Sequence, residues 1–151
     1  MNKETKINKL SDPSLINELA HYFSLIWGIP VTAYVESMEE SLQTKTGVPS
    51  WYYITKDNAI IGGVGLIVND FHKRTDLTPN IVALYVDENY RHLGLAKKLL
   101  AKVYEDLVAN GIHTVYLITT HRELYEKLGY FFVGDIEELD GNLVRCYGKN
   151  I

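Results

Sequence analysis

The stretch from Asn80 to Asn110 constrains the fold most, because it reads as a strand, a turn and a helix in direct succession. Residues 80–86 are almost wholly apolar, which is typical of a sheet centre covered on both faces. A helix predicted from about Gly94 follows the turn, with one apolar stripe that includes Val108, and with Asp106 facing water. Such a unit favours an α/β fold over an all-helical or all-β one.

The start of this helix carries the pattern Arg91-His92-Leu93-Gly94-Leu95-Ala96, which predicts an anion site. The first N–H groups of a helix have no internal partner, and the helix dipole adds positive charge there. Gly94 lets a ligand approach the main chain, while Arg91, Lys97 and Lys98 add charge for phosphate oxygens. The pattern is neither a Rossmann fingerprint, which needs more glycines, nor a P-loop, which needs Gly-Lys-Ser/Thr.

The remaining segments predict one domain over residues 1–151. A short strand at 5–10 precedes a helix capped by Asp12 and ended by Gly28, and Thr32 caps a second helix to about residue 44. Residues 51–55 and 59–68 form a hairpin, and a long polar loop, 69–79, leads to the strand at 80–86.

After the long helix, residues 115–118 form a strand parallel to 80–86. A capping box at 120–123 opens a short helix, and an antiparallel pair at 130–133 and 143–147 ends the chain. The expected fold class is α/β with a central mixed sheet of six to seven strands, flanked by about four helices.

Charge and composition narrow the function. The net charge of −4 argues against nucleic acid as a partner. The one cysteine, Cys146, rules out an intrachain disulfide and reads as a packed thiol, and the scattered histidines predict no metal site. The first residues lack the apolar core of a signal peptide, and the longest apolar run, 59–68, is too short to span a membrane. We therefore expect a soluble, cytoplasmic protein with no membrane partner.

Two motifs together resemble the GNAT acetyltransferase superfamily. Arg91-His92-Leu93-Gly94-Leu95-Ala96 is similar to the family's acyl-CoA motif, Arg/Gln-x-x-Gly-x-Gly/Ala. About thirty residues on, Leu124-Tyr125-Glu126-Lys127-Leu128-Gly129-Tyr130 looks like its aromatic-Tyr-x-x-x-Gly-aromatic segment, with Leu124 in place of an aromatic residue. The resemblance covers nearly the whole chain and implies a GNAT-like domain.

The resemblance implies acetyl-CoA as acyl donor, with no metal. Backbone groups of the strand at 84–86 would pair with the pantetheine arm, and amides from about His92 to Lys97 would hold the diphosphate. The implied cofactor-binding residues are Leu84, Tyr85, Val86, Arg91, His92, Leu93, Gly94, Leu95, Ala96 and Lys97. Tyr125 matches the tyrosine that protonates the departing thiolate, a role that suits a phenol positioned beside a thiol.

The acceptor side is less determined by the sequence. Asp70, His72 and Glu36 are candidates for the base, and Trp27, Tyr34, Asp70 and His72 are the candidate substrate residues. Phe71, Trp51 and Tyr52 could also line the acceptor side, although the last two favour the core because they lie in a strand. The acidic balance favours a cationic acceptor, such as a polyamine or an aminoglycoside-like compound.

The prediction is an N-acetyltransferase acting on a primary amine of a small molecule. Two alternatives stay open: an enzyme acting on a protein or peptide amine, and a non-catalytic acyl-CoA-binding module. A homodimer is expected because the strand at 143–147 reads as an apolar sheet edge.

Overall fold

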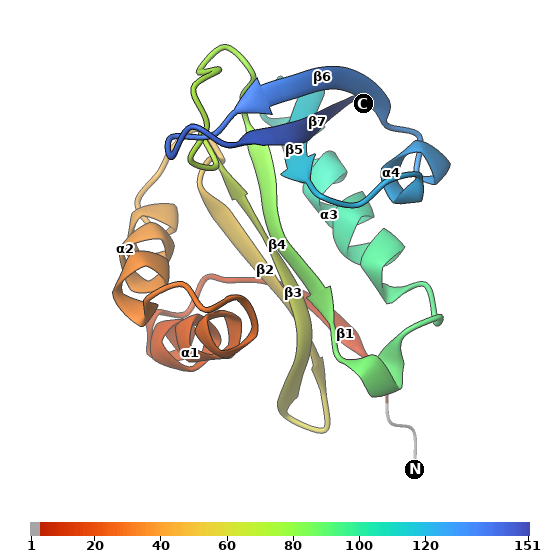
Figure 1. The fold of residues 1–151 in the computed structure, drawn as a ribbon. Coiled ribbons are helices and arrows are strands. Elements are labelled where there is room, and N and C mark those ends of the chain that lie inside the picture. Colours follow the sequence, from red (N-terminus) through yellow and green to blue (C-terminus); the bar gives the residue numbers. More distant parts are fainter. Residues whose placement is uncertain (1–3) are drawn as a thin grey trace.

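The computed structural model describes residues 4–151 as a seven-stranded sheet flanked by helices (Figure 1). Residues 1–3 of the predicted domain lie outside this described range. The strands are β1 (Lys6–Lys9), β2 (Ser50–Lys56), β3 (Ala59–Ile67), β4 (Asn80–Val86), β5 (Thr114–Thr119), β6 (Phe131–Glu137) and β7 (Leu143–Asn150). The α-helices are α1 (Ile16–Trp27), α2 (Val31–Ser41), α3 (Leu95–Ala109) and α4 (Leu124–Lys127), with 3₁₀ turns at Pro13–Leu15 and Glu88–Tyr90.

The order of the strands is β1-β2-β3-β4-β5-β7-β6. Neighbours are antiparallel except β4 and β5, which are parallel and joined by the crossover helix α3, as the sequence predicts. The expectation that residues 143–147 form a sheet edge is wrong, because β7 lies between β5 and β6. The argument for a homodimer from an exposed edge at 143–147 is therefore not supported. The edge strand on that side of the sheet is β6.

Helices cover both faces of the sheet: α1 and α2 lie on one face and α3 on the other (Figure 1). Side chains of β2 alternate between the two cores, so that Trp51 packs under α1 and α2 while Tyr52 packs under α3. Gly65 of β3 makes room for the Trp51 ring, since a Cβ there would lie 2.4 Å from it. Cys146 is fully buried in a third cluster, as expected of a packed thiol.

The strands β4 and β5 diverge beyond a single register pair, Asn80↔Tyr116. In addition, β4 bulges: Gly63 pairs with Tyr85 and Gly65 with Val82, so two residues of β4 face one residue of β3. Ala83, within the bulge, has φ 58°. The divergence and the bulge together open the middle of the sheet toward the carboxyl end of β4.

Some local predictions are wrong, each for a physical reason. Helix α2 begins one residue before Thr32, behind Pro30, and no side chain caps it. The capping box fails because Glu123 takes φ 70° at the start of α4, with no side-chain cap. Val108 is 46% exposed because it lies about 100° round α3 from Leu107, which faces the sheet.

Asp106 is also placed differently from the prediction, because it is partly buried rather than solvated. Its carboxylate accepts a 2.8 Å hydrogen bond from Tyr52 and pairs with Lys102 at 3.3 Å. Other predictions are confirmed, among them the Asp12 cap, which accepts from the Ser14 N–H, and Gly28 at the end of α1 with φ 71°.

Candidate functional site

A cavity of about 810 Å³ lies where β4 and β5 diverge. It is mostly apolar, and its polar groups are few. The lining residues include Trp27, Ile29, Ala33, Tyr34, Ser37, Trp51, Asp70, Phe71, Val82, Ala83, Leu84, Tyr85, Val86, Arg91, Ala96, Thr119, Thr120, His121, Leu124 and Tyr125. A volume of this size is typical of small-molecule and cofactor sites.

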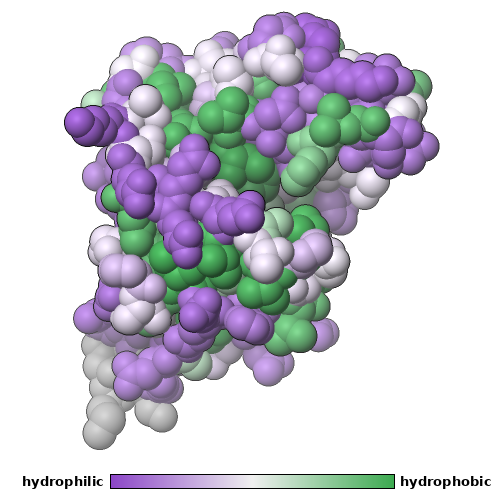
Figure 2. All heavy atoms as spheres, turned by 90° about the vertical axis from the view of Figure 1, so that its left-hand side faces the viewer, coloured by the Kyte–Doolittle hydropathy of each residue, from purple (hydrophilic) through white to green (hydrophobic). Residues whose placement is uncertain are grey.

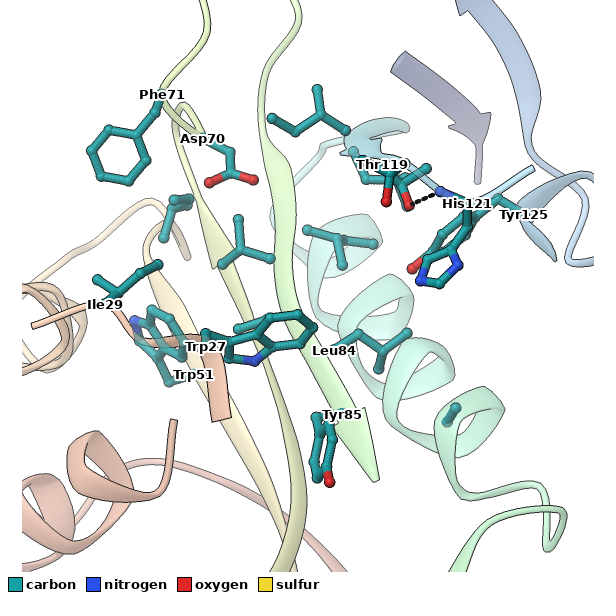
Figure 3. A pocket seen from close by; sticks show the side chains of 18 of the residues that line it. Trp27, Ile29, Trp51, Asp70, Phe71, Leu84, Tyr85, Thr119, His121 and Tyr125 are labelled. Carbon is teal, nitrogen blue, oxygen red and sulfur yellow. Dashed lines mark hydrogen bonds between the residues drawn. The ribbon is translucent and has the colours of Figure 1, made fainter. Parts of the chain in front are cut away.

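The cavity straddles β4 (Figure 3). On one side, Trp27, Asp70 and Phe71 come from α1 and the 69–79 loop; on the other, His121 and Tyr125 come from the region after β5. Seen from the side of α1 and α2, hydrophobic atoms reach the surface between hydrophilic ones (Figure 2). The cavity therefore has two halves, which we call the α1–α2 side and the β5–α4 side.

The turn before α3 keeps the features of an anion site. Gly94 has φ 78°, and a Cβ built on it would meet no atom within 4 Å. No side chain caps the first N–H groups of the helix, so these donors stay available to a ligand. Leu95 is only 4% exposed, so only its main chain can serve such a ligand.

Arg91 stabilises this turn through two contacts with the end of β4. Its Nε donates a 2.8 Å hydrogen bond to the Val86 carbonyl, and its guanidinium lies 5.2 Å from the centre of the Tyr85 ring. The side chains of His92, Leu93 and Lys97 are exposed and do not line the cavity. Of the predicted cofactor residues, the cavity brings together Leu84, Tyr85, Val86, Arg91 and Ala96.

Sequence reasoning missed the bulge at Ala83 and the polar residues at and just after the carboxyl end of β5. A left-handed alanine carries no glycine signal, so nothing in the sequence marks the bulge. Thr119, Thr120 and His121 line the cavity, and the Thr119 hydroxyl accepts the His121 N–H at 3.0 Å (Figure 3). Their position after a buried strand, where such side chains gather at a sheet edge, could have indicated them.

Tyr125 is partly buried on the β5–α4 side, and its side chain lies at the cavity in Figure 3. Its ring packs edge-on against Tyr130, with centroids 5.5 Å apart, and at a tilt against Tyr147. Burial raises the pKa of its hydroxyl. The phenol therefore keeps its proton at neutral pH and can donate it.

Asp70 is the acidic group of the α1–α2 side. Burial raises the pKa of its carboxyl to about 6, with a smaller lowering by His72 and a raising by Glu138. Within residues 4–151 no hydrogen bond to this carboxylate is found. A desolvated carboxylate with free lone pairs can bind a cation or accept a proton near neutral pH.

The structure does not bring His72 or Glu36 into the cavity. His72 is 1% exposed; its Nδ1 accepts the Arg74 N–H at 3.2 Å and its Nε2 lies 2.8 Å from Asn80 Oδ1. Nε2 must then carry the hydrogen, and the ring serves to hold the 69–79 loop on β4. Glu36 is exposed on α2.

The aromatic residues divide between core and cavity. Trp51 and Tyr52 are buried, as predicted, although Trp51 also lines the cavity and donates from Nε1 to the Ser37 hydroxyl at 2.9 Å. Trp27 and Phe71 are 47% and 58% exposed, at the cavity rim. Tyr34 is 5% exposed, and its hydroxyl has no hydrogen-bond partner in the described part of the chain.

No group of three or more His, Cys, Asp or Glu side chains within residues 4–151 is arranged to hold a metal ion. No helix in the same range has the length and apolar character needed to cross a bilayer.

Residues 13–130 match the model of the acetyltransferase (GNAT) family. Among solved structures, a GNAT-family acetyltransferase from Streptococcus pneumoniae aligns with a TM-score of 0.74 and 18% identity, covering 98% of this chain and 99% of that one. The protein yncA from Salmonella typhimurium, solved with acetyl-CoA, aligns at 0.72 and 11%, covering 97% and 94%.

An aminoglycoside 6'-N-acetyltransferase complexed with coenzyme A aligns with a TM-score of 0.72 and 19% identity, covering 96% of each chain. These likenesses show a shared fold. A search of curated proteins finds no match.

Proposed function

We infer that this chain, which belongs to the acetyltransferase (GNAT) family, transfers an acetyl group from acetyl-CoA to the primary amine of a small molecule. One observation carries the proposal: Asp70 and Tyr125 line one cavity from opposite sides of β4 (Figure 3). A proton acceptor and a proton donor are the two groups that acyl transfer from a thioester to an amine requires.

The residues on the β5–α4 side and at the start of α3 fit acetyl-CoA. The uncapped N–H groups at the start of α3 would hold the diphosphate, and the open space over Gly94 leaves room for it. Backbone groups of 84–86 would hold the pantetheine arm, because β4 pairs with β5 only at Asn80↔Tyr116 and this part of its edge toward β5 is left without a strand partner.

When bound, acetyl-CoA supplies the acetyl thioester. Asp70 takes a proton from the ammonium of the acceptor, and the free amine then forms a C–N bond to the acetyl carbon while the C–S bond breaks. Tyr125 donates its phenolic proton to the departing thiolate. After the C–N bond has formed, the nitrogen loses a second proton, which returns through solvent to the Tyr125 phenolate. Asp70 releases the first proton to solvent. The products are therefore an amide, a CoA thiol and one proton.

The aromatic lining on the α1–α2 side of the cavity favours a small acceptor over a protein or peptide amine. A protein acceptor needs an open groove along the surface, whereas Tyr34 and Trp51 of this cavity are almost completely buried. The presence of a proton acceptor, Asp70, and a proton donor, Tyr125, in one cavity favours an enzyme over a non-catalytic acyl-CoA-binding module. A cytoplasmic location and a homodimer stay predictions.

The test is release of CoA thiol from acetyl-CoA in the presence of a panel of primary amines. Tyr125→Phe should lower kcat by about 10²- to 10⁴-fold, the usual contribution of a general acid, and leave the Kd for acetyl-CoA unchanged. Tyr104→Phe is the control, because this variant also removes a tyrosine hydroxyl. The Tyr104 hydroxyl is hydrogen-bonded to that of Tyr130, and Tyr104 does not line the cavity.

Unchanged kcat in Tyr125→Phe would remove this residue as the acid. Acetyl-CoA binding with no turnover of any amine would favour the non-catalytic module. Turnover of peptide amines alone would favour the protein acceptor.

A further inference from the structure

The hydroxyl of Tyr34 is the most unusual polar atom of the cavity. Tyr34 is only 5% exposed, and its hydroxyl lacks any hydrogen-bond partner among residues 4–151. A buried hydroxyl left unpaired destabilises the folded protein, because it loses its hydration without gaining a hydrogen bond. The ring lies against Phe23 and Trp51, with centroids 5.6 Å away in each case, so the hydroxyl is held in place.

Asp70 lines the same α1–α2 side of the cavity. Burial, and secondarily the charge of Asp70, raise the pKa of Tyr34 to about 12, so the carboxylate is near enough to act on this hydroxyl. The two groups are not hydrogen-bonded to each other. Each therefore retains lone pairs for a third group placed between them.

The charges of the cavity limit what that third group can be. Among the described lining residues, Asp70 has the only carboxylate, and the only permanent cation, Arg91, lies on the side of the α3 turn. Around Asp70 the walls are large and apolar, formed by Trp27, Ile29, Trp51 and Phe71. A polyamine or an aminoglycoside would bring several ammonium groups into these walls, and each unpaired one would lose its hydration without compensation.

We propose that the acceptor is a primary amine with a single positive charge on an aromatic body, of the arylalkylamine type, whose ammonium lies between the Asp70 carboxylate and the Tyr34 hydroxyl. This inference rests on the proposed function and names its substrate class. It replaces the polycationic acceptor that the net charge suggested.

The chemistry of an ammonium fits the pair. Its three N–H donors can reach the carboxylate and the phenol oxygen at once. The rings of Trp27 and Phe71 at the rim are partly exposed, so they can attract a cation on entry and then pack against an aryl group. Tyr34 is a binding residue in this account, whereas Asp70 both binds the ammonium and takes its proton.

The test compares kcat/KM at pH 7.5 for phenethylamine and tryptamine with that for spermidine and kanamycin, at saturating acetyl-CoA. We expect the two aryl amines to be favoured by at least about 100-fold, because each further ammonium group would lose its hydration in an apolar site without compensation. Ethylamine, which has the charge without the ring, should fall between the two groups through a raised KM.

Variants then separate binding from chemistry. Tyr34→Phe should raise KM for phenethylamine about 10-fold or more with kcat nearly unchanged, as expected for one lost hydrogen bond to a charged group. Tyr53→Phe, in the same α1–α2 core but away from the cavity lining, should leave both constants unchanged. Asp70→Asn should lower kcat and kcat/KM together.

Preference for spermidine or kanamycin, or an unchanged KM in Tyr34→Phe, would overturn the inference and leave the acetyltransferase intact. Saturable acetyl-CoA binding without turnover of any amine would overturn both. The two failures are therefore distinguishable in one set of measurements.

Discussion

The carboxylate of Asp70 has lost much of its hydration without gaining a hydrogen bond from residues 4–151. Burial raises the pKa of this group to about 6, above the ordinary value of 3.8 that it regains on unfolding. Its charge therefore destabilises the native protein at neutral pH, a common cost of a functional group held in an apolar site.

We predict that Asp70→Asn stabilises the protein at pH 7.5, by up to about 3 kcal/mol from a pKa difference near two units. Above pH 6 the wild-type carboxyl is ionised in both states and carries the full cost; below about pH 4 it is neutral in both, and the gain disappears. Urea unfolding of the two proteins at pH 7.5 and pH 4 measures the difference. If the variant were still more stable than the wild type at pH 4, the difference would come from packing and not from the charge of Asp70.

We also predict that kcat/KM falls as the pH drops through about 6, because protonated Asp70 can neither hold an ammonium nor take its proton. Burial is the main cause of the raised pKa of Asp70; His72 lowers that pKa and Glu138 raises it by smaller amounts. Glu138→Gln should therefore move the midpoint of the pH profile to lower pH. A profile without a midpoint near 6 in the wild type would remove Asp70 as the base.

Among the elements, α3 is the helix that packs on the sheet and whose first N–H groups would bind acetyl-CoA. Its buried stripe, Leu95, Leu99, Val103 and Leu107, holds it on the sheet, so that its first N–H groups end beside the cavity. The strand β4 contributes the other half of this arrangement, since its bulge at Ala83 interrupts pairing with β3 at residues that line the cavity.

The two ends of α3 offer a matched pair of variants. Gly94 and Gly111 have φ 78° and 77°, and neither has an atom within 4 Å of a built Cβ. Gly94→Trp and Gly111→Trp should therefore destabilise the protein equally, by about 1–2 kcal/mol from the left-handed backbone. Isothermal titration should show acetyl-CoA binding abolished in Gly94→Trp alone, and equal binding by both variants would contradict an anion site at this turn.

At the scale of the whole molecule, the sheet consists of two continuously paired parts that separate from each other between β4 and β5. Pairing is continuous from β1 to β4 and from β5 through β7 to β6, whereas β4 and β5 share one register pair. A ligand that spans this opening would tie the two halves to each other.

We therefore predict that acetyl-CoA at about 100 times its Kd stabilises the native protein by about 2.7 kcal/mol. For a chain of this size that corresponds to a rise in Tm of roughly 5–10 °C. Thermal unfolding followed by circular dichroism measures it, and Gly94→Trp should show no rise. An equal rise with that variant would place the binding elsewhere in the molecule.

The sequence by itself determined the elements and the start of the site. Hydrophobic periodicity gave the long helix and the buried strands, and the Arg91–Ala96 pattern together with Tyr125 indicated the family that the comparison confirms. These features are local: each depends on residues within a few turns of one another, so the chain displays them before it folds.

Only the tertiary structure decided which polar groups meet. It brought Asp70 and Tyr34, from a loop and a helix, to one side of the cavity, and withdrew His72 into hydrogen bonds with the backbone of Arg74 and the side chain of Asn80. It also placed β7 inside the sheet and bent β4 at Ala83. Strand order, bulges and burial depend on contacts between distant segments, for which a single sequence carries no periodic signal.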